Sequence, residues 1–453
     1  MARGADDAAK AAYLDVLQLQ PTHCQALVEL GALALASGHR SAARAAWRQA
    51  ALHHPSSALA QTAFGNLLIE DGDSDAGRMR FAQALASAPD YAPAHQGMAR
   101  LLEAAGDAAA AAQARQRGFT GHAIGRRRYR GTGEGIALLL LVSARGGNVP
   151  VRHWIDDRLY AVTTLCPEFH PEGMKLPPHR LVINAIGDAE LCGAALAAAG
   201  RLLAAARAPG IDAAMARPVL NPPQRVRLTG RLDNASRLAR IEGVIAPRML
   251  HLPRASIAAA EALGYPLLLR VPGLHTGQHC VRVASHAALA PAAAALPGDD
   301  LLAIGCLDAR SPDGLWRKYR VMVIGGALYP LHLAISAQWK VHYFTAAMAD
   351  DAGHRAEEHR FLLDMPGCIG ARAMVALAGI AAALGLDYAG IDFALAADGS
   401  VLLFEANATM VINPPEPDMI WDYRRPAIAA ALAAAAGLVA AACAHVADLG
   451  GAG

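Results

Sequence analysis

Apolar and small residues recur with a period of 34 in the first 117 residues, and Pro21, Pro55 and Pro89 mark that period. The first complete unit begins at Cys24. Its apolar, small and helix-ending positions are Leu27, Leu30, Gly31, Ala34, Ala43, Trp47, Ala50 and Pro55, and the next unit keeps Phe64, Gly65, Leu68, Gly77, Phe81, Ala84 and Pro89. This pattern predicts stacked helix pairs, in which small residues permit close contact and proline ends the second helix.

These positions resemble the signature of tetratricopeptide (TPR) repeats, and the resemblance covers residues 1–117. It implies an all-α array of TPR helical repeats that presents a concave surface to a peptide or protein. The alternative roles are packing against the rest of the chain and formation of a homodimer. The first unit lacks its opening helix, which leaves open whether the native chain starts upstream of Met1.

The pattern changes at residue 136 to buried apolar runs that alternate with helical segments, which predicts an α/β domain over residues 136–247. Residues 248–425 mix strands and helices in an order typical of an α+β fold. Within them, a strand ends at Arg270 and is followed by a loop that runs from Gly273 to Gly277. The chain is therefore predicted to be multidomain.

Two segments depart from these patterns. Residues 118–135 are rich in glycine and predict a basic linker, whose side chains are either solvated or bind an acidic partner: Arg126, Arg127, Arg128 and Arg130. Residues 426–453 predict an alanine-rich helix. Its stretch from Pro426 to Ala444 carries no charge and approaches the length of a transmembrane helix. Because alanine gains little from lipid, we expect a buried C-terminal helix and no membrane partner.

A hairpin is predicted from residue 390 to residue 407, because Asp398-Gly399 lies between apolar, strand-like runs. If these two residues form the turn, Asp392 lies opposite Glu405, and Asn407 follows on the same face. Oxygen ligands of this kind suit Mg²⁺ or Mn²⁺. The alternative is a surface hairpin, and a change of one residue in the loop would move Asp392 out of this register.

Composition narrows the functional classes. Of the 453 residues, 18% are charged, and the net charge of +2 argues against a nucleic-acid partner. The seven cysteines are scattered singly, without a CxxC pair, which is typical of a reducing compartment. No secretory signal pattern is visible at the N-terminus, so we expect a cytoplasmic protein. No GxxxxGK[ST] motif occurs, which argues against a P-loop protein.

The order of these features resembles that of ATP-grasp enzymes, together with the preceding domain that such enzymes carry. The features are a strand ending in a cation, a glycine loop, a hinge, YRVMVIGGALYPLHLA and DYAGIDFALAADGSVLLFEAN. The resemblance runs from about residue 136 to residue 425 and implies an ATP-grasp nucleotide-binding and catalytic lobe.

The resemblance also implies roles for individual residues. Asp392, Glu405 and Asn407 would hold the Mg²⁺ ions that bridge the ATP phosphates. The positions implied for ATP itself are Arg231 and Arg270 at the phosphates, Gly273 and Gly277 in the glycine loop, Ile304 to Leu307 as the adenine hinge, and Asp308 near the ribose. The family usually has lysine at the two phosphate positions, and arginine keeps the charge but changes its geometry.

Catalysis is assigned by the same resemblance. Lys340 and His332 would steady the transferring phosphoryl group, and Arg320 would either contact it or brace the metal-binding acids. The implied reaction is ligation of a carboxylate substrate to an amine or related nucleophilic acceptor through an acylphosphate, with a peptide or protein as the acceptor that the repeats would present. The alternatives are a phosphotransferase and a noncatalytic TPR adaptor with a relic nucleotide site.

Overall fold

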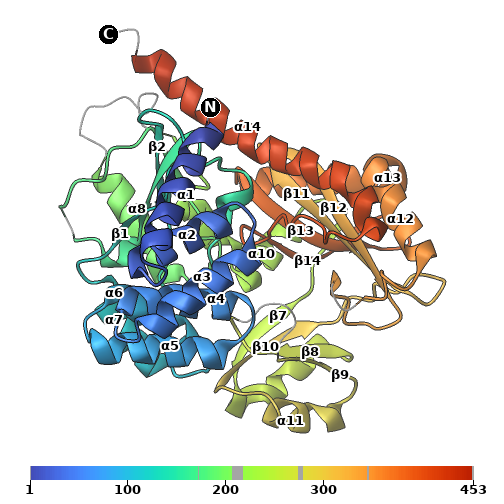
Figure 1. Ribbon diagram of the computed structural model, residues 1–453. Helices are drawn as coiled ribbons and strands as arrows, with labels where there is room; N and C mark the ends of the chain where they lie inside the picture. Colours follow the sequence, from blue (N-terminus) through green and yellow to red (C-terminus); the bar gives the residue numbers. More distant parts are fainter. Residues whose placement is uncertain (1, 172, 207–217, 274–278, 344–345, 451–453) are drawn as a thin grey trace. The chain divides into compact units, whose positions relative to one another are not determined.

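The computed structural model describes residues 2–171, 173–206, 218–273, 279–343 and 346–450 (Figure 1). The chain divides into two compact units. The N-terminal unit comprises Met1–Gly146 and Asp156–Arg180, and the C-terminal unit comprises Gly147–Ile155 and Leu181–Gly453. Part of the segment expected to form an α/β domain therefore groups with the repeats.

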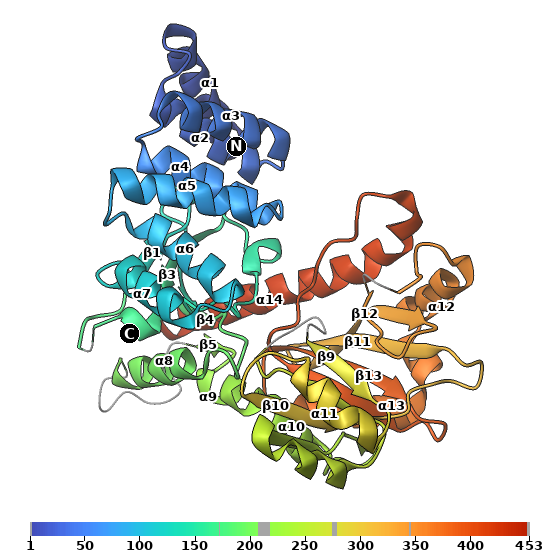
Figure 2. The ribbon, with the colours of Figure 1, turned by 90° about the horizontal axis from the view of Figure 1, so that it is seen from below.

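The N-terminal unit begins with helices that pack as consecutive pairs, α2 with α3, α4 with α5 and α6 with α7 (Figure 2). The N-termini of α4, α5 and α7 are capped by Ser57, Asp73 and Asp107, respectively. Each of these side chains accepts a hydrogen bond from the backbone N–H three residues ahead. The helices are α1 (Ala2–Leu19), α2 (Cys24–Ala36), α3 (Arg40–His53), α4 (Ala58–Glu70), α5 (Ser74–Ser87), α6 (Ala92–Ala104) and α7 (Ala108–Phe119).

Glycine and an aromatic side chain complement each other within and between the helix pairs. A Cβ atom on Gly31 would lie 2.5 Å from Nε1 of Trp47. The same indole N–H donates a hydrogen bond of 2.9 Å to the carbonyl oxygen of Val28. In the next unit, Phe81 is fully buried, and a Cβ atom on Gly97 would lie 2.2 Å from its ring. The recurring glycines are therefore required by the space that the aromatic rings occupy.

Three strands complete the N-terminal unit: β1 (Ile124–Arg126), β2 (Ile136–Leu141) and β3 (Tyr160–Leu165). Strand β3 pairs with β1 in antiparallel and with β2 in parallel orientation. The segment interpreted as a linker therefore contains a strand. Two of its four arginines form ion pairs within the unit, because Arg130 donates to Asp157 at 2.9 Å and Arg128 lies 3.4 Å from Glu29.

The C-terminal unit begins with a parallel pair of strands, β4 (Leu181–Asn184) and β5 (Val219–Leu220). A four-stranded antiparallel sheet follows in the order β7-β10-β8-β9. Its strands are β7 (Met249–Pro253), β8 (Leu267–Arg270), β9 (Cys280–Val283) and β10 (Asp300–Gly305). The helices of this part are α8 (Gly193–Ala205), α9 (Pro223–Val226), α10 (Arg231–Leu238) and α11 (His286–Ala294).

The third group of strands forms a sheet in the order β12-β11-β13-β14-β6. Its strands are β6 (Val244–Ile245), β11 (Trp316–Ile324), β12 (Ala327–Ser336), β13 (Tyr388–Leu395) and β14 (Val401–Asn407), and α12 (Ala352–Leu363), α13 (Met365–Leu384) and α14 (Arg425–Gly450) pack against it. Strand β13 is buried on both faces, as the apolar residues on either side of Asp392 predict. The predicted fold class, helical repeats followed by α/β and α+β parts, is confirmed.

Helix α14 is buried along one face only. The helix packs on β11 and β12 (Figure 1), and its buried residues are Ile428, Ala431, Ala435, Val439 and Cys443. In the most apolar 18-residue window of Met419–Ala444, 28% of the residues are buried, so the prediction of a buried helix is correct for one face and wrong for the rest. Among the described residues, this segment and α13 are long and apolar enough to cross a membrane, a property that core helices share.

We expect Phe81→Ala to lower the free energy of unfolding of the N-terminal unit by about 3–5 kcal/mol, because it removes a fully buried ring from between two helix pairs. Urea denaturation of the full chain, followed by circular dichroism, measures the change. Met79→Ala on the same helix is the control, because Met79 is 72% exposed. Equal effects of the two substitutions would contradict the packing role of Phe81.

Candidate functional site

The hairpin of β13 and β14 places Asp392 directly opposite Glu405, as predicted. The turn differs from the predicted one. Ala396 pairs with Ser400 through a backbone hydrogen bond of 2.9 Å, so the loop has three residues. Its last residue, Gly399, has φ +79°, the left-handed conformation that glycine adopts readily.

A β-bulge restores the register that the longer loop would otherwise shift. Phe393 pairs with Leu403, whereas Asp392 pairs with Glu405, so Phe404 is the extra residue of β14. The predicted two-residue turn was therefore wrong. The predicted acid pair was correct, because the extra residue in the loop is offset by the extra residue of β14 at the bulge.

Asp392 is buried in a network of cations. Arg320 donates to its two carboxylate oxygens at 2.6 and 2.8 Å, and Lys318 donates at 3.1 Å. Both cations come from β11, where alternate residues share a face. Burial alone would raise the pKa of the Asp392 carboxyl, but the charges of Arg320 and Lys318 outweigh burial and hold this pKa well below its ordinary value.

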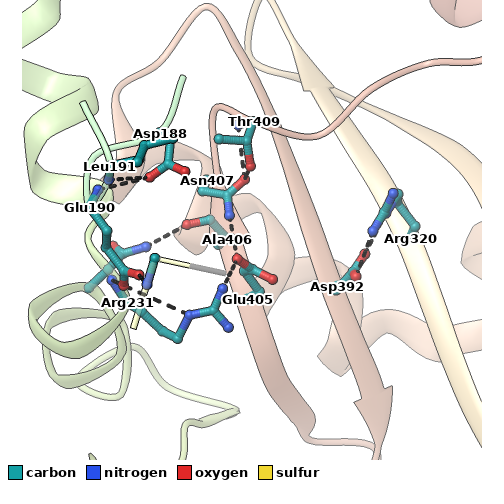
Figure 3. Close-up of polar contacts among 12 residues, drawn as sticks. Asp188, Glu190, Leu191, Arg231, Arg320, Asp392, Glu405, Ala406, Asn407 and Thr409 are labelled. Carbon is teal, nitrogen blue, oxygen red and sulfur yellow. Dashed lines mark hydrogen bonds and ion pairs between the residues drawn. The ribbon is translucent and has the colours of Figure 1, made fainter. Parts of the chain in front are cut away.

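Glu405 is bound by a different set of donors (Figure 3). Its Oε1 accepts hydrogen bonds from Arg231 at 2.6 Å and from Nδ2 of Asn407 at 2.7 Å. The Asn407 amide oxygen in turn accepts from the backbone N–H and hydroxyl of Thr409. Figure 3 shows Asp392 turned toward Arg320 and Glu405 turned toward Arg231. The two acids are therefore opposite in register but held by separate cations.

The two acids line one cavity of about 600 Å³ in the C-terminal unit. The predicted residues that share its lining are Arg231, Arg270, Ile304, Leu307, Arg320, Lys340, Asp392, Glu405 and Asn407. Six cationic and three acidic side chains line this cavity, so positive charge is in excess. Burial, and then the nearby charge of Arg231, lower the pKa of Arg270. A negatively charged ligand would be stabilised in this cavity.

Four predicted residues lie elsewhere or outside the described chain. Asp308 has a side chain that is 71% exposed, and it lies 3.9 Å from Arg310. Gly273 donates its backbone N–H to Glu190 at 3.4 Å. His332 lines a second, smaller cavity. Gly277 lies outside the described residues.

Several residues in or near the cavity were not predicted from the sequence. Lys318 carries a signal that was available, because it lies two residues before Arg320 on a predicted strand and therefore on the same face. Glu190 carried no such signal. It accepts a hydrogen bond of 3.0 Å from the backbone N–H of Arg231, at the start of α10, and lies 3.8 Å from the guanidinium of Arg231. Asp188 accepts from the backbone N–H groups of Glu190 and Leu191, which positions that loop.

The donor atoms of the acid pair are compatible with a hard divalent cation. Among the described residues, Oε2 of Glu405 accepts no hydrogen bond, so this carboxylate oxygen is available to a metal ion. Each oxygen of Asp392 already accepts from a cation, but a carboxylate has about four acceptor positions. Asn407 as placed turns its amide nitrogen, not its oxygen, toward Glu405. Glu405 and Asp392 therefore fit Mg²⁺ better than Asn407 does.

The chain was compared with protein-family models, curated proteins and solved structures. No protein-family model matches the chain, and no curated protein matches it significantly. At the N-terminal end, MamA is 22% identical over 26% of this chain and 68% of its own, with a TM-score of 0.23.

Solved structures similar to the C-terminal part include D-alanine–D-alanine ligase from Bacillus anthracis complexed with ATP, which is 12% identical over 70% of this chain and 98% of its own, with a TM-score of 0.42. A RimK domain protein, described as ATP-grasp, from Sphaerobacter thermophilus is 17% identical over 68% of this chain and 98% of its own, with a TM-score of 0.40. The C-terminal part resembles ATP-grasp enzymes. The resemblance to ATP-grasp enzymes that the sequence indicated is thereby confirmed.

We expect Arg320→Leu to lower the free energy of unfolding of the C-terminal unit by about 3–5 kcal/mol, because it leaves the buried Asp392 carboxylate with Lys318 alone. Urea denaturation measures this loss. Arg310→Leu is the control, because the Arg310 side chain is 58% exposed and its acid partner lies 3.9 Å away. A loss below about 1 kcal/mol for Arg320→Leu would contradict the stabilising role of this ion pair.

The stability of the C-terminal unit should also decrease at acid pH, because Asp392 becomes protonated. A carboxyl group whose pKa is lower in the folded state stabilises the fold above its unfolded pKa, about 3.9, and this contribution is lost as the pH falls through the folded pKa. We therefore expect the free energy of unfolding to fall less steeply from about pH 5 to pH 2 in Asp392→Asn than in the native chain. Asp308→Asn, at an exposed position, should keep the native slope. Parallel curves of unfolding free energy against pH for Asp392→Asn and the native chain would refute the lowered pKa of Asp392 in the folded state.

Proposed function

We propose that this chain is an ATP-dependent ligase that joins a carboxylate to an amine or related nucleophile through an acylphosphate. The observation that carries the proposal is the pairing of Asp392 with Glu405 on the wall of a cation-rich cavity of about 600 Å³. Phosphoryl transfer depends mainly on positioning and on neutralisation of charge, and this cavity offers groups for both.

The dimensions and lining of the cavity suit a nucleotide. Its volume lies within the range of small-molecule sites, about 300–1,000 Å³. Met249, Leu268, Ile304 and Phe404 supply apolar walls for a flat base. The backbone from Ile304 to Leu307, at the end of β10, would offer hydrogen-bonding groups to the edge of that base.

The cations have distinct tasks in this proposal. Arg270 and Lys340 line the cavity and would bind the phosphates. Arg320 is held by Asp392, so it would contribute a fixed positive charge and keep the acid ionised. A magnesium ion held by Glu405 and Asp392 would supply further neutralisation of the phosphate charge.

The proposed reaction balances in two steps. An oxygen of the substrate carboxylate attacks the γ-phosphorus, the bond to the β-phosphate oxygen breaks, and ADP leaves. The acceptor nitrogen then attacks the acyl carbon, inorganic phosphate leaves with the electron pair of the broken C–O bond, and the nitrogen loses a proton to solvent. A peptide or protein acceptor presented by the repeats, cytoplasmic localisation and a homodimer stay predictions from the sequence.

We expect ATP with Mg²⁺ to raise the melting temperature of the native chain, because ligand at a hundredfold excess over its Kd adds about 2.7 kcal/mol of stability. The shift should disappear with EDTA and should fall by at least half in Glu405→Gln. Glu242→Gln, at an exposed position outside the cavity, is the matched control and should keep the full shift. No shift in the native chain would favour the adaptor alternative.

The products distinguish the two enzymatic alternatives. A ligase should release ADP and inorganic phosphate in equal amounts only when both substrates are present. A phosphotransferase would instead release ADP together with a stable phosphorylated product.

A further inference from the structure

A second cavity, of about 300 Å³, lies beside the first in the C-terminal unit. The two cavities share five lining residues: Lys318, Arg320, His342, Val411 and Asn413. The rest of the second cavity is lined by β12 and by segments that precede α12 and α14. A molecule in the second cavity would therefore reach the wall that also borders the nucleotide cavity.

Arg424 presents a fixed guanidinium group to this cavity. The residue is 8% exposed, its Nε lies 3.3 Å from Glu358, and its guanidinium carbon lies 4.2 Å from the ring centre of Tyr343. Glu358 is fully buried and also accepts hydrogen bonds from the Tyr423 hydroxyl at 2.5 Å and from the backbone N–H of Leu333 at 3.3 Å. Arg424 is itself part of the cavity lining, so a bound ligand would lie within reach of its guanidinium group.

His332 adds a buried polar group whose hydrogen bonds are not satisfied. The residue is 6% exposed, its ring centre lies 4.8 Å from that of Tyr343, and its Nδ1 has no hydrogen-bond partner among the described residues. Burial, and then the charge of Arg320, lower the pKa of His332 well below its ordinary value, so the imidazole is neutral at neutral pH. A buried polar group without a partner is costly, and a bound molecule would remove that cost.

The remaining lining favours a compact ligand with an apolar body. Leu331, Met348, Pro414 and Trp421 supply apolar and aromatic surface. The volume is at the lower limit for small-molecule sites, which excludes a folded protein segment as the occupant of the cavity itself. Arg424 offers one planar fork, and Glu358 behind it already neutralises part of its charge. A monoanionic carboxylate matches that fork better than a doubly charged phosphate does.

We propose that the second cavity binds one substrate of the ligase, a compact molecule that carries an anchoring carboxylate on an apolar body. Arg424 holds the carboxylate, His332 donates or accepts a hydrogen bond beside it, and the opposite end of the molecule faces Lys318, Arg320 and His342 at the shared wall. The assignment of the ligand as a substrate rests on the proposed function, whereas its binding does not.

The test uses 4-methylpentanoate as the probe and its neutral amide, 4-methylpentanamide, as the matched control ligand. Ligand-observed NMR on the full chain measures both dissociation constants. We expect the carboxylate to bind at least tenfold more tightly than the amide, because a charge-assisted pair to arginine is lost in the amide. No binding of 4-methylpentanoate at 50 mM, or equal binding of the two probes, would overturn the proposal.

Variants locate the binding to this cavity. Arg424→Gln alone leaves Glu358 buried without its cation and can unfold the chain, so the double variant Arg424→Gln with Glu358→Gln removes both charges together. Ala346→Phe narrows the cavity and leaves Arg424 in place. Both variants should weaken binding of 4-methylpentanoate at least tenfold. Arg425→Gln, at the adjacent position where the side chain is 44% exposed, should leave it unchanged.

The melting shift caused by ATP with Mg²⁺ separates this proposal from the proposed function. The shift should be retained in both cavity variants, since neither changes a residue of the nucleotide cavity. Retained probe binding in folded variants would refute the second cavity as the site. If ATP with Mg²⁺ did not shift the melting temperature of the native chain, while 4-methylpentanoate still bound more tightly than the amide, the ligase proposal would be refuted and the carboxylate site would be retained.

Discussion

The ion pair between Arg320 and Asp392 is the interaction on which the site depends. Asp392 lies on a strand that is buried on both faces, where an unpaired carboxylate would be very costly. Arg320 and Lys318 compensate this charge from the neighbouring strand, so the sheet must keep β11 and β13 in one register. Arg320 and Lys318 also line both cavities and supply fixed positive charge at their boundary. Stability and electrostatics of the site therefore have a common origin.

Sequence patterns predicted those elements whose signals are local. The repeat period predicted the helix pairs because Trp47 and Phe81 fill spaces that glycine leaves open one helix away. The apolar runs of β13 and β14 predicted a hairpin, and its acid pair was found in spite of a wrong turn. The strand at Ile124–Arg126 was missed, because a three-residue strand within a glycine-rich, basic segment has no periodic pattern to detect.

The candidate site was predictable to the extent that its residues lie on strands. Lys318 and Arg320 share a face by simple alternation. Glu190 was missed because a loop before α8 brings it to Arg231, which is 41 residues away in the sequence, and Asp188 was missed because it lies in the same loop. His332, which the resemblance alone assigned to the phosphoryl group, lines the second cavity. Contacts of that kind depend on tertiary packing, which periodicity does not encode.

The bulge at Phe404 couples two parts of the hairpin that are distant along the strands. One residue more or fewer in the loop after Leu395 would set Asp392 against a different partner, unless β14 lost or gained one residue at the bulge as well. Insertions and deletions in this hairpin are thus tolerated only in compensating pairs. Among diverging copies of such a chain, the length of the loop and the presence of the bulge should change together, while the spacing of the two acids from each other across the sheet stays constant.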